Sequence, residues 1–151
     1  MSNALLAQPG DIIAVASDHA GVELKAVVAA ELAALGFRVD DLGTSGTASV
    51  DYPDFGVAVG RHVVSGKAKG GVLICGTGIG ISIAANRLPG VRAVLAHDLF
   101  TAQMGREHND GNVLALGARV VSIDTAKHLV RTFFTTPFGG GRHAGRVAKL
   151  G

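Results

Sequence analysis

The residues with the clearest capacity for chemistry are a lone cysteine, Cys75, and the glycine-rich stretch that follows it, Gly76-Thr77-Gly78-Ile79-Gly80. An apolar run precedes them and a stretch with helical spacing follows, which predicts a strand, a loop and a helix. Backbone N–H groups at such a helix N-terminus attract anions and favour the thiolate form of a nearby cysteine. This position favours a reactive thiol at Cys75 over a small buried hydrophobic residue. The shape of the loop alone leaves two interpretations open, an anion cradle and a tight turn that requires glycine.

The spacing of the glycines argues against two common nucleotide sites. The loop lacks the Gly-x-Gly-x-x-Gly pattern that binds dinucleotides. It also follows the third predicted strand, whereas that pattern usually follows the first. Neither Gly-Lys-Ser nor Gly-Lys-Thr comes after it, which excludes a Walker phosphate loop. The loop therefore remains a candidate for holding a phosphate or a developing oxyanion.

Two pairs of polar residues follow other predicted strands. Asp18 and His19 end the first strand, which is often a neighbour of the third in a doubly wound sheet, so both sites could face one cleft. Asp18 is equally suited to cap a helix, and the two roles are compatible. His97 and Asp98 follow the fourth strand, where Asp98 is expected to be an N-cap and the pair is at most part of a pocket wall.

The second half of the chain adds a histidine, an amide and two arginines. His108 and Asn109 lie at a predicted helix end, where a histidine often only complements the helix dipole, but Asn109 can hydrogen-bond a sugar hydroxyl or an enediolate. Arg142 and Arg146 are four residues apart, so on a helix they could grip one phosphate together. A solvated basic tail is the alternative for the arginines.

The elements that must position these residues alternate along the chain. Apolar runs predict five strands, and helical spacing predicts five helices between and after them, with a last short helix near Arg142. The strands are expected at 12–17, 37–42, 70–75, 92–96 and 113–116, and the helices at 22–35, 51–64, 79–87, 99–107 and 123–134. This order predicts an α/β fold, a doubly wound five-stranded parallel sheet with helices on both faces. We expect a single domain over residues 11–151 after a loose N-terminal tail of residues 1–10.

Composition narrows the setting and the partners. The chain has 151 residues, a net charge of +2 and one cysteine, which argues against a disulfide framework and a multi-cysteine zinc site and favours a reducing, cytoplasmic compartment. The six histidines lack a convincing ligand spacing, so no metal or other cofactor is predicted. Neither a nucleic-acid surface nor a membrane segment is supported by the weak charge, the few aromatic residues or the N-terminus.

Read together and in order, the polar motifs resemble the ribose-5-phosphate isomerase B family, which also contains galactose-6-phosphate isomerase subunits. The resemblance spans residues 12–150, and it rests on Ser17-Asp18-His19-Ala20-Gly21, Asp51-Tyr52-Pro53, Cys75-Gly76-Thr77-Gly78-Ile79-Gly80-Ile81-Ser82-Ile83-Ala84-Ala85-Asn86, His108-Asn109-Asp110 and Gly140-Gly141-Arg142-His143-x-x-Arg146-Val147. Some relatives lack the cysteine and use a glutamate a few residues later. Here those later positions are Ile81 and Ser82, so the cysteine type fits better.

The resemblance implies a metal-free aldose–ketose isomerase of the pentose phosphate pathway, on a Rossmann-like sheet. It also implies a homodimer or dimer of dimers with sites shared between subunits. Cys75 would be the base that moves a proton between C2 and C1 of the opened sugar, with Thr77 and His108 assisting ring opening. The substrate-binding residues implied in the same way are Asp18 and Tyr52, the amides of Gly76, Gly78 and Gly80, Asn109 at the enediolate, and His19, Arg119, Arg142 and Arg146 at the phosphate.

The substrate expected from the resemblance is a phosphorylated sugar, with ribose 5-phosphate and ribulose 5-phosphate as the first choice. Tetrose, allose or galactose phosphates are alternatives, because family members with these motifs act on different sugars, and the pocket walls that discriminate among the sugars are expected to include residues 43–50 and 97–100. A phosphate- or nucleotide-binding module without catalysis is the competing hypothesis from another class.

Overall fold

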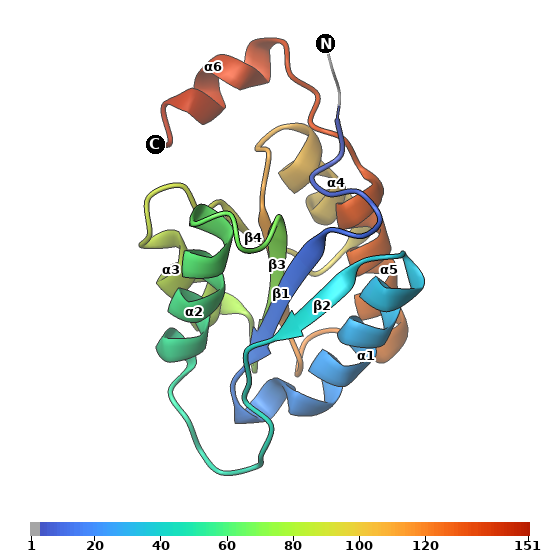
Figure 1. Cartoon of the computed structure of the whole chain (residues 1–151), viewed down its shortest axis with the longest axis vertical. Coiled ribbons are helices and arrows are strands. Elements are labelled where there is room, and N and C mark those ends of the chain that lie inside the picture. The colour runs from blue at the N-terminus through green and yellow to red at the C-terminus, as the bar shows by residue number, and fades with distance from the viewer. Residues whose placement is uncertain (1–3) are drawn as a thin grey trace.

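The computed structural model describes residues 4–151 and contains one five-stranded parallel sheet in the order β2-β1-β3-β5-β4 (Figure 1). The strands are β1 (Ile12–Ser17), β2 (Arg38–Asp41), β3 (Gly70–Cys75), β4 (Ala93–Leu95) and β5 (Val113–Gly117). The prediction of a doubly wound parallel sheet is confirmed, as is the pairing of the first strand with the third.

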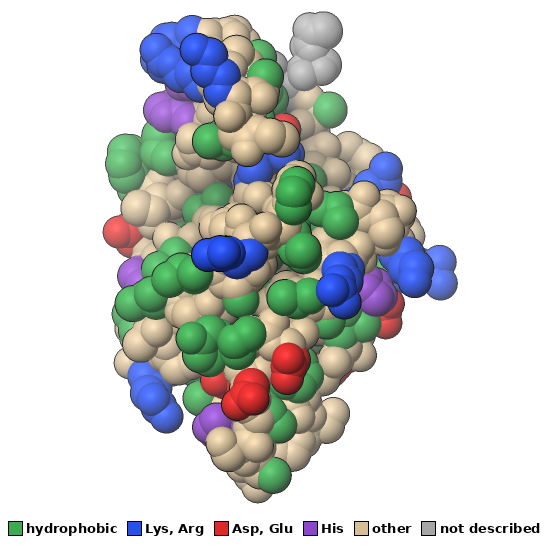
Figure 2. All heavy atoms as spheres, turned by 90° about the vertical axis from the view of Figure 1, so that its left-hand side faces the viewer, with side chains coloured by type: hydrophobic (Ala, Val, Ile, Leu, Met, Phe, Trp, Pro, Cys, Tyr) green, Lys and Arg blue, Asp and Glu red, His purple; other side chains and the backbone are tan. Residues whose placement is uncertain are grey.

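Helices cover both faces of the sheet. One face carries α1 (Val22–Ala34), α4 (Leu99–Glu107) and α5 (Ile123–Thr135), and the other carries α2 (Tyr52–Val64) and α3 (Ile79–Asn86) (Figure 1). A 3₁₀ turn, η1 (His19–Gly21), precedes α1. Helix α6 (Arg142–Ala148) projects beyond the sheet at the end where β1 begins (Figure 1), and Lys and Arg side chains gather at that end of the molecule (Figure 2). Within residues 4–151, no helix is both long enough and apolar enough to cross a bilayer.

The three central strands bury both of their faces. In β3, Val72 and Ile74 face the α1/α5 core, whereas Leu73 and Cys75 face the α2/α3 core. This two-sided burial explains why these strands are continuous apolar runs rather than alternating ones. Register places Cys75 opposite Gly117, so β3 and β5 end at the same level and their following loops lie side by side.

The N-terminal segment differs from the loose tail expected for residues 1–10. Of these, residues 1–3 lie outside the described part, and the next residues pack on the domain. Ala7 is 2% exposed and Leu6 packs against the core that contains Phe134. Gly10 donates a backbone hydrogen bond to Gly36 at 2.9 Å, which ties the segment to the end of α1. Apolar burial and this bond hold residues that composition alone suggested were unattached.

An ion pair with one buried partner, Lys25, holds the start of the loop at 43–50. Lys25 on α1 is 4% exposed, and its ammonium group contacts both carboxylate oxygens of Asp41 at 2.6 and 2.7 Å. The same carboxylate accepts a hydrogen bond from the Gly43 N–H at 2.9 Å. Asp41 therefore links α1, the end of β2 and the start of a loop that reaches His19.

This ion pair makes an asymmetric prediction about stability. Asp41→Ala leaves the buried ammonium group of Lys25 without a partner, and it is expected to lower the free energy of unfolding by about 2 kcal/mol. The loss is smaller than for a fully buried pair, because Asp41 is partly hydrated in the folded protein. Lys25→Met should cost clearly less, because water solvates the half-exposed Asp41 left behind. Urea unfolding of both variants measures the difference, and an equal or reversed order would contradict the interpretation.

Candidate active site

The carboxyl ends of β1, β3 and β5 form one edge of an open cleft of about 480 Å³. This is the edge at which ligands bind in open α/β sheets. The residues that line it are Asp18, Tyr52, Cys75, Gly76, Thr77, Ile79, Gly80, Ile83 and Arg119. Eight predicted site residues are brought together here or beside it, seven of them as lining residues and Gly78 within the same loop.

Cys75 is held by the loop that follows it. The Gly78 N–H donates a hydrogen bond to the Cys75 Sγ at 3.2 Å, and the thiol is 5% exposed. Gly78 has a φ of +78°, a left-handed conformation that glycine adopts without strain. A Cβ at this position would also lie 2.6 Å from Leu95. The tight-turn interpretation is therefore correct for Gly78, and the turn it makes aims an amide at the sulfur.

The start of α3 presents further donors to the cleft. Thr77 is exposed, and its Oγ1 accepts the Ile79 N–H at 3.2 Å, which caps the helix locally. Gly80 lies in the first turn, where an N–H has no carbonyl of its own helix to bond. The Tyr52 ring packs on Gly80 so closely that a Cβ there would lie 2.6 Å from two ring carbons. A side chain at this position would displace the ring that forms one wall of the cleft.

Asp18 caps a helix, which is one of the two roles that sequence allowed, and it also lies in the wall of the cleft. Its Oδ1 accepts the Ala20 N–H at 3.0 Å and so caps η1, and its backbone N–H donates to Ile74 on β3. The carboxylate is 7% exposed and contributes to the wall of the cleft. Capping fixes the side chain, so any ligand in the cleft meets a carboxylate that is already oriented.

His19 lies beside Asp18 and faces the loop at 43–50. Its Nδ1 accepts the Val50 N–H at 3.2 Å. In the neutral ring this arrangement leaves the proton on Nε2, which is then a hydrogen-bond donor with a fixed direction. The loop that sequence proposed as a pocket wall is thus attached to a predicted substrate-binding residue.

Arg119 brings positive charge to the glycine loop. The backbone N–H of Arg119 donates to Gly76 O at 2.9 Å, and the backbone N–H of Ala118 donates to Cys75 O at 2.9 Å. The β3–β5 ladder therefore continues beyond the strands. A Cβ on Gly76 would come within 3.0 Å of the guanidinium, which therefore lies over that residue. Backbone amides and an exposed guanidinium next to one thiol make this cleft suited to an anion.

The other predicted residues lie at the opposite edge of the sheet. His108 and Asn109 precede β5, whereas Cys75 is level with the last residue of β5, so the length of a strand of about 15 Å separates them. Arg142 and Arg146 are on α6, which continues from the same end (Figure 1). Within the single chain, this second group does not meet the cysteine cleft.

The second group is held together by stacking and one backbone bond. The rings of His108 and His143 stack with centroids 4.1 Å apart, and Gly139 donates to Glu107 O at 2.8 Å. All seven residues of α6 are described, and none of them is buried. The helix therefore presents its arginines to solvent beside His108.

His97 and Asp98 do not line the cysteine cleft. Asp98 caps α4 as predicted, accepting the Thr101 N–H at 2.8 Å and the Thr101 hydroxyl at 2.8 Å. These two hydrogen bonds, the backbone one first, hold the pKa of Asp98 below its ordinary value. The position of the carboxylate is explained by helix capping.

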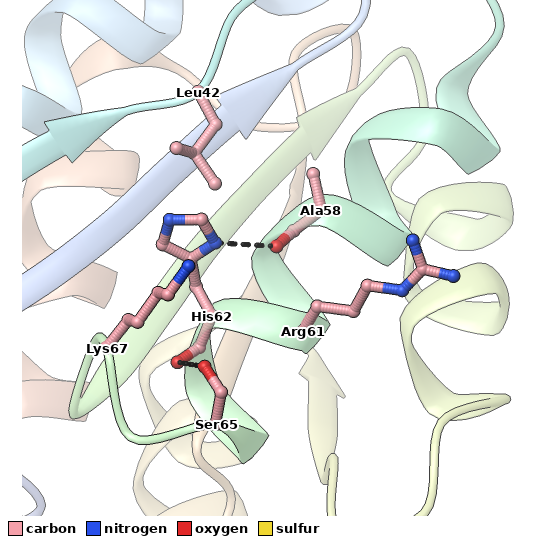
Figure 3. Close-up of a pocket in the computed structure, with 6 residues that line it drawn as sticks. All are labelled: Leu42, Ala58, Arg61, His62, Ser65 and Lys67. Atoms are coloured by element: carbon pink, nitrogen blue, oxygen red, sulfur yellow. Dashed lines mark hydrogen bonds between the residues drawn. The ribbon is translucent and has the colours of Figure 1, made fainter.

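A separate cleft lies between α2 and the edge strand β2. It is lined by Leu42, Ala58, Arg61, His62, Ser65 and Lys67 (Figure 3). The His62 ring contacts Ala58 O at 3.2 Å and Asp40 at 3.5 Å, while Arg61 extends away from that ring. The cationic groups of this cleft do not converge on one point, and the residues predicted for chemistry lie outside the cleft.

Sequence reasoning missed three residues that shape the cysteine cleft. Ile79 and Ile83 are 50% and 57% exposed at its rim, and they are four residues apart on α3. Two exposed isoleucines on one helical face were the available signal. Gly117 is the third, because a Cβ there would lie 2.6 Å from the Thr77 backbone. Nothing local to Gly117 indicates this contact, since it joins two loops that are far apart in the chain.

Comparison with known proteins gives consistent matches over nearly the whole chain. The profile of the family described as Ribose/Galactose Isomerase matches residues 13–150. The ribose-5-phosphate isomerase B of Escherichia coli is 46% identical over 138 residues, which are 91% of this chain and 93% of that protein. The D-erythrulose-4-phosphate isomerase of Pectobacterium atrosepticum is 37% identical over 140 residues, covering 92% of each. The solved structure of Clostridium thermocellum ribose-5-phosphate isomerase B superimposes with a TM-score of 0.91 at 52% identity, covering 93% of this chain and 95% of that one.

The stacked histidines generate a prediction about pH. Loss of hydration, followed by the positive charges of His108, Arg142 and Arg146, lowers the pKa of His143. As the pH falls, the unfolded chain therefore binds a proton at His143 before the folded chain does. The contribution of neutral His143 to the stability of this arm is complete above about pH 6.5, the pKa of the unfolded chain, and it is lost as the pH falls from there toward the lower pKa of the folded state.

An NMR titration of the His143 ring tests this directly. The midpoint should lie below that of an unstructured histidine, and His108→Ala should raise it toward the ordinary value by removing both the neighbouring ring and its charge. A His143 midpoint that is ordinary in the parent protein, or unmoved by the substitution, would show that the two rings do not interact in solution.

Proposed function

The chain belongs to the ribose/galactose isomerase family and is an isomerase of sugar phosphates, and from this premise we propose that it interconverts ribose 5-phosphate and ribulose 5-phosphate. The observation that carries the proposal is the cleft in which a lone thiol, the amides of a glycine loop and a guanidinium converge. Relatives described as ribose-5-phosphate isomerase B support this choice of sugar.

In the proposed mechanism Cys75 is the base. The thiolate removes the proton from C2 of the opened aldose, the electron pair forms a double bond between C1 and C2, and negative charge passes to the oxygen on C1. Return of the proton to C1, with transfer of the O2 proton to O1, gives the ketose. The Gly78 amide donates to the sulfur, and Gly76 and Gly80 line the same cleft, so amides of this loop would stabilise the negative charge that develops on the sugar.

The remaining roles follow the family resemblance. Asp18 and Tyr52 would hold sugar hydroxyls, since both are in the wall of the cleft. Thr77 is exposed beside Cys75 and would assist ring opening with His108, while Asn109 would help to stabilise the enediolate. Arg119 and His19 would contact the phosphate from this chain, together with Arg142 and Arg146.

The separation of the two residue groups supports a site shared between subunits. Cys75 and His108 lie at opposite edges of the sheet, so one chain cannot direct both at one sugar. A homodimer, or a dimer of dimers, would bring the α6 arm of one subunit to the cysteine cleft of its partner. The exposed isoleucines Ile79 and Ile83 at the rim supply an apolar surface for such contact. A reducing cytoplasmic compartment suits a mechanism that depends on a free thiol.

A tetrose phosphate is the second candidate substrate. The observation that favours it is the match to a D-erythrulose-4-phosphate isomerase over most of both chains. The two sugars differ in length by one carbon, and the loop at 43–50, which is attached to His19, is the segment that we expect to discriminate between them. Specificity constants for four-, five- and six-carbon aldose phosphates decide between them, and the highest value for the pentose supports the first choice.

The role of Cys75 is tested by one substitution. Ketose formation from ribose 5-phosphate should fall by about a thousandfold or more in Cys75→Ala, because loss of the base leaves only binding and the amide cradle. Since the proposed steps use no metal, a chelator should leave the parent rate unchanged. Turnover that survives in the variant would exclude Cys75 as the base, and an inactive parent on every sugar phosphate tested would refute the function itself.

The shared site is tested by complementation between two inactive variants. Cys75→Ala and His108→Ala should each be inactive alone. Refolded together in equal amounts, half of the dimers are mixed and each mixed dimer contains one intact site, so activity should return to about a quarter of the parent value. A mixture as inactive as its components would show that the two residues act within one chain or not at all.

A further inference from the structure

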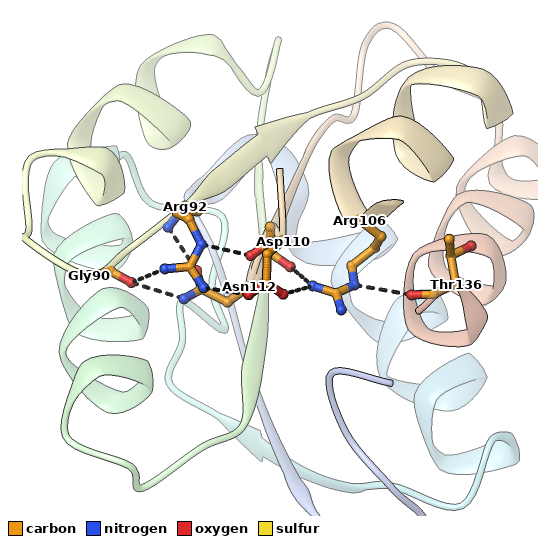
Figure 4. A network of polar contacts seen from close by, with 7 residues as sticks. Gly90, Arg92, Arg106, Asp110, Asn112 and Thr136 are labelled. Carbon is orange, nitrogen blue, oxygen red and sulfur yellow. Dashed lines mark hydrogen bonds and ion pairs between the residues drawn. The ribbon is translucent and has the colours of Figure 1, made fainter. Parts of the chain in front are cut away.

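A buried arginine lies between the two parts of the second residue group. Arg106, near the end of α4, is 1% exposed and belongs to the polar network of Figure 4. Its Nη1 donates to Asp110 Oδ1 at 2.9 Å and to Gly111 O at 2.6 Å. Its Nε donates to Thr136 O at 3.2 Å. One planar guanidinium therefore spans the turn after α4 and the chain that leaves α5.

The turn itself is fixed from both sides. Asp110 has a φ of +48°, a left-handed backbone that aspartate tolerates better than most residues. Arg92, before β4, donates from Nε to Asp110 O at 2.7 Å, and its second nitrogen lies 3.4 Å from Asp110 Oδ2. The carboxylate thus bridges two guanidinium groups, and Asn112 binds Gly90 O at 2.9 Å just beyond it.

The contacts of Arg106 and Asp110 lie on either side of the two residues, His108 and Asn109, that the proposed mechanism uses at this edge of the sheet. His108 and Asn109 lie between Arg106 and Asp110, two residues that are joined by an ion pair across one helical turn. Thr136, the third acceptor of Arg106, begins the segment that leads to α6 and its arginines. Because α6 has no buried residue in the described structure, apolar burial does not hold it. The Arg106–Thr136 bond holds the start of the segment that leads to α6, the Gly139–Glu107 bond holds its end, and the His108–His143 stack contacts the helix itself.

We propose that Arg106, clamped by Asp110, is a positioning residue that sets His108 and the α6 arm in one fixed relation. This proposal rests on the proposed function, in which both parts must reach the same sugar phosphate. Arginine suits the role because its planar fork binds a carboxylate and two carbonyl groups in fixed directions, whereas the single ammonium group of lysine does not match that geometry. Burial lowers the pKa of Arg106, whereas the hydrogen bond and the charge of Asp110 oppose that shift, so the buried guanidinium has a partner for its charge.

The experiment compares Arg106→Lys with Arg131→Lys. Arg131 on α5 is the control for the same substitution: its side chain is 54% exposed, and it pairs with an acidic residue, Glu31, between α5 and α1, away from both residue groups. Arg106→Lys should lower kcat by about tenfold and raise KM for the aldose phosphate, since a displacement near 1 Å at a reacting group costs up to about a hundredfold. The control should retain the parent kcat and KM, even if its free energy of unfolding falls.

A second measurement does not depend on activity. In histidine NMR spectra, Arg106→Lys and Asp110→Asn should remove the ring-current shifts that His108 and His143 exert on each other, while Arg131→Lys retains them. Reduced stability with unchanged kcat, KM and histidine shifts in both clamp variants would overturn the proposal and leave a purely structural ion pair. If the parent protein isomerises no sugar phosphate, the proposed function fails, and the histidine shifts still decide whether Arg106 positions this edge.

Discussion

The parallel hydrogen-bond ladder between β3 and β5 is the interaction on which the cysteine cleft depends. It does not stop with the strands, because Ala118 and Arg119 continue to donate to the carbonyls of Cys75 and Gly76. This extension holds the guanidinium-bearing loop against the glycine loop. It requires close approach of two backbones, which is why Gly117 lies against Thr77 with no space for a Cβ. The contact with the Thr77 backbone therefore explains why residue 117 is a glycine.

The same principle acts on the other side of the central strands. The backbone N–H of Ser17 donates to Gly43 O, and the backbone N–H of Thr44 donates to Ser17 O. The backbone N–H of Asp18 donates to Ile74 O on β3. The carboxylate and histidine that follow β1 are therefore fixed by backbone bonds before any ligand is present. Preorganised groups lose little conformational entropy on binding, so the cleft can direct its polar atoms at a charged sugar with little reorganisation.

Most of the fold could be predicted from sequence because its signals are local. Continuous apolar runs mark the buried strands, helical spacing marks α1 and α5, and Asp98 and Ser122 mark two helix starts. The packing of Leu6 and Ala7 could not be predicted, since a short apolar patch has no period that separates a bound segment from a free one. The placement of the candidate site was predictable in part. Cys75 and Asp18 follow strands and share an edge, whereas His108 precedes a strand, and that difference in order already places it at the other edge.

Different interactions hold the residue groups at the two edges of the sheet in place. The cysteine cleft is rigid because it is made from the ends of buried strands, where backbone bonds and core packing leave little freedom. The α6 arm has neither advantage, since a helix of seven residues is marginal by itself and this one buries no side chain. Its order must come from a small number of directed contacts, and a buried guanidinium with a paired carboxylate supplies direction that apolar packing does not. In the proposed dimer, these contacts would hold the arm of one subunit in place to complete the cleft of the other, and catalysis would then require assembly.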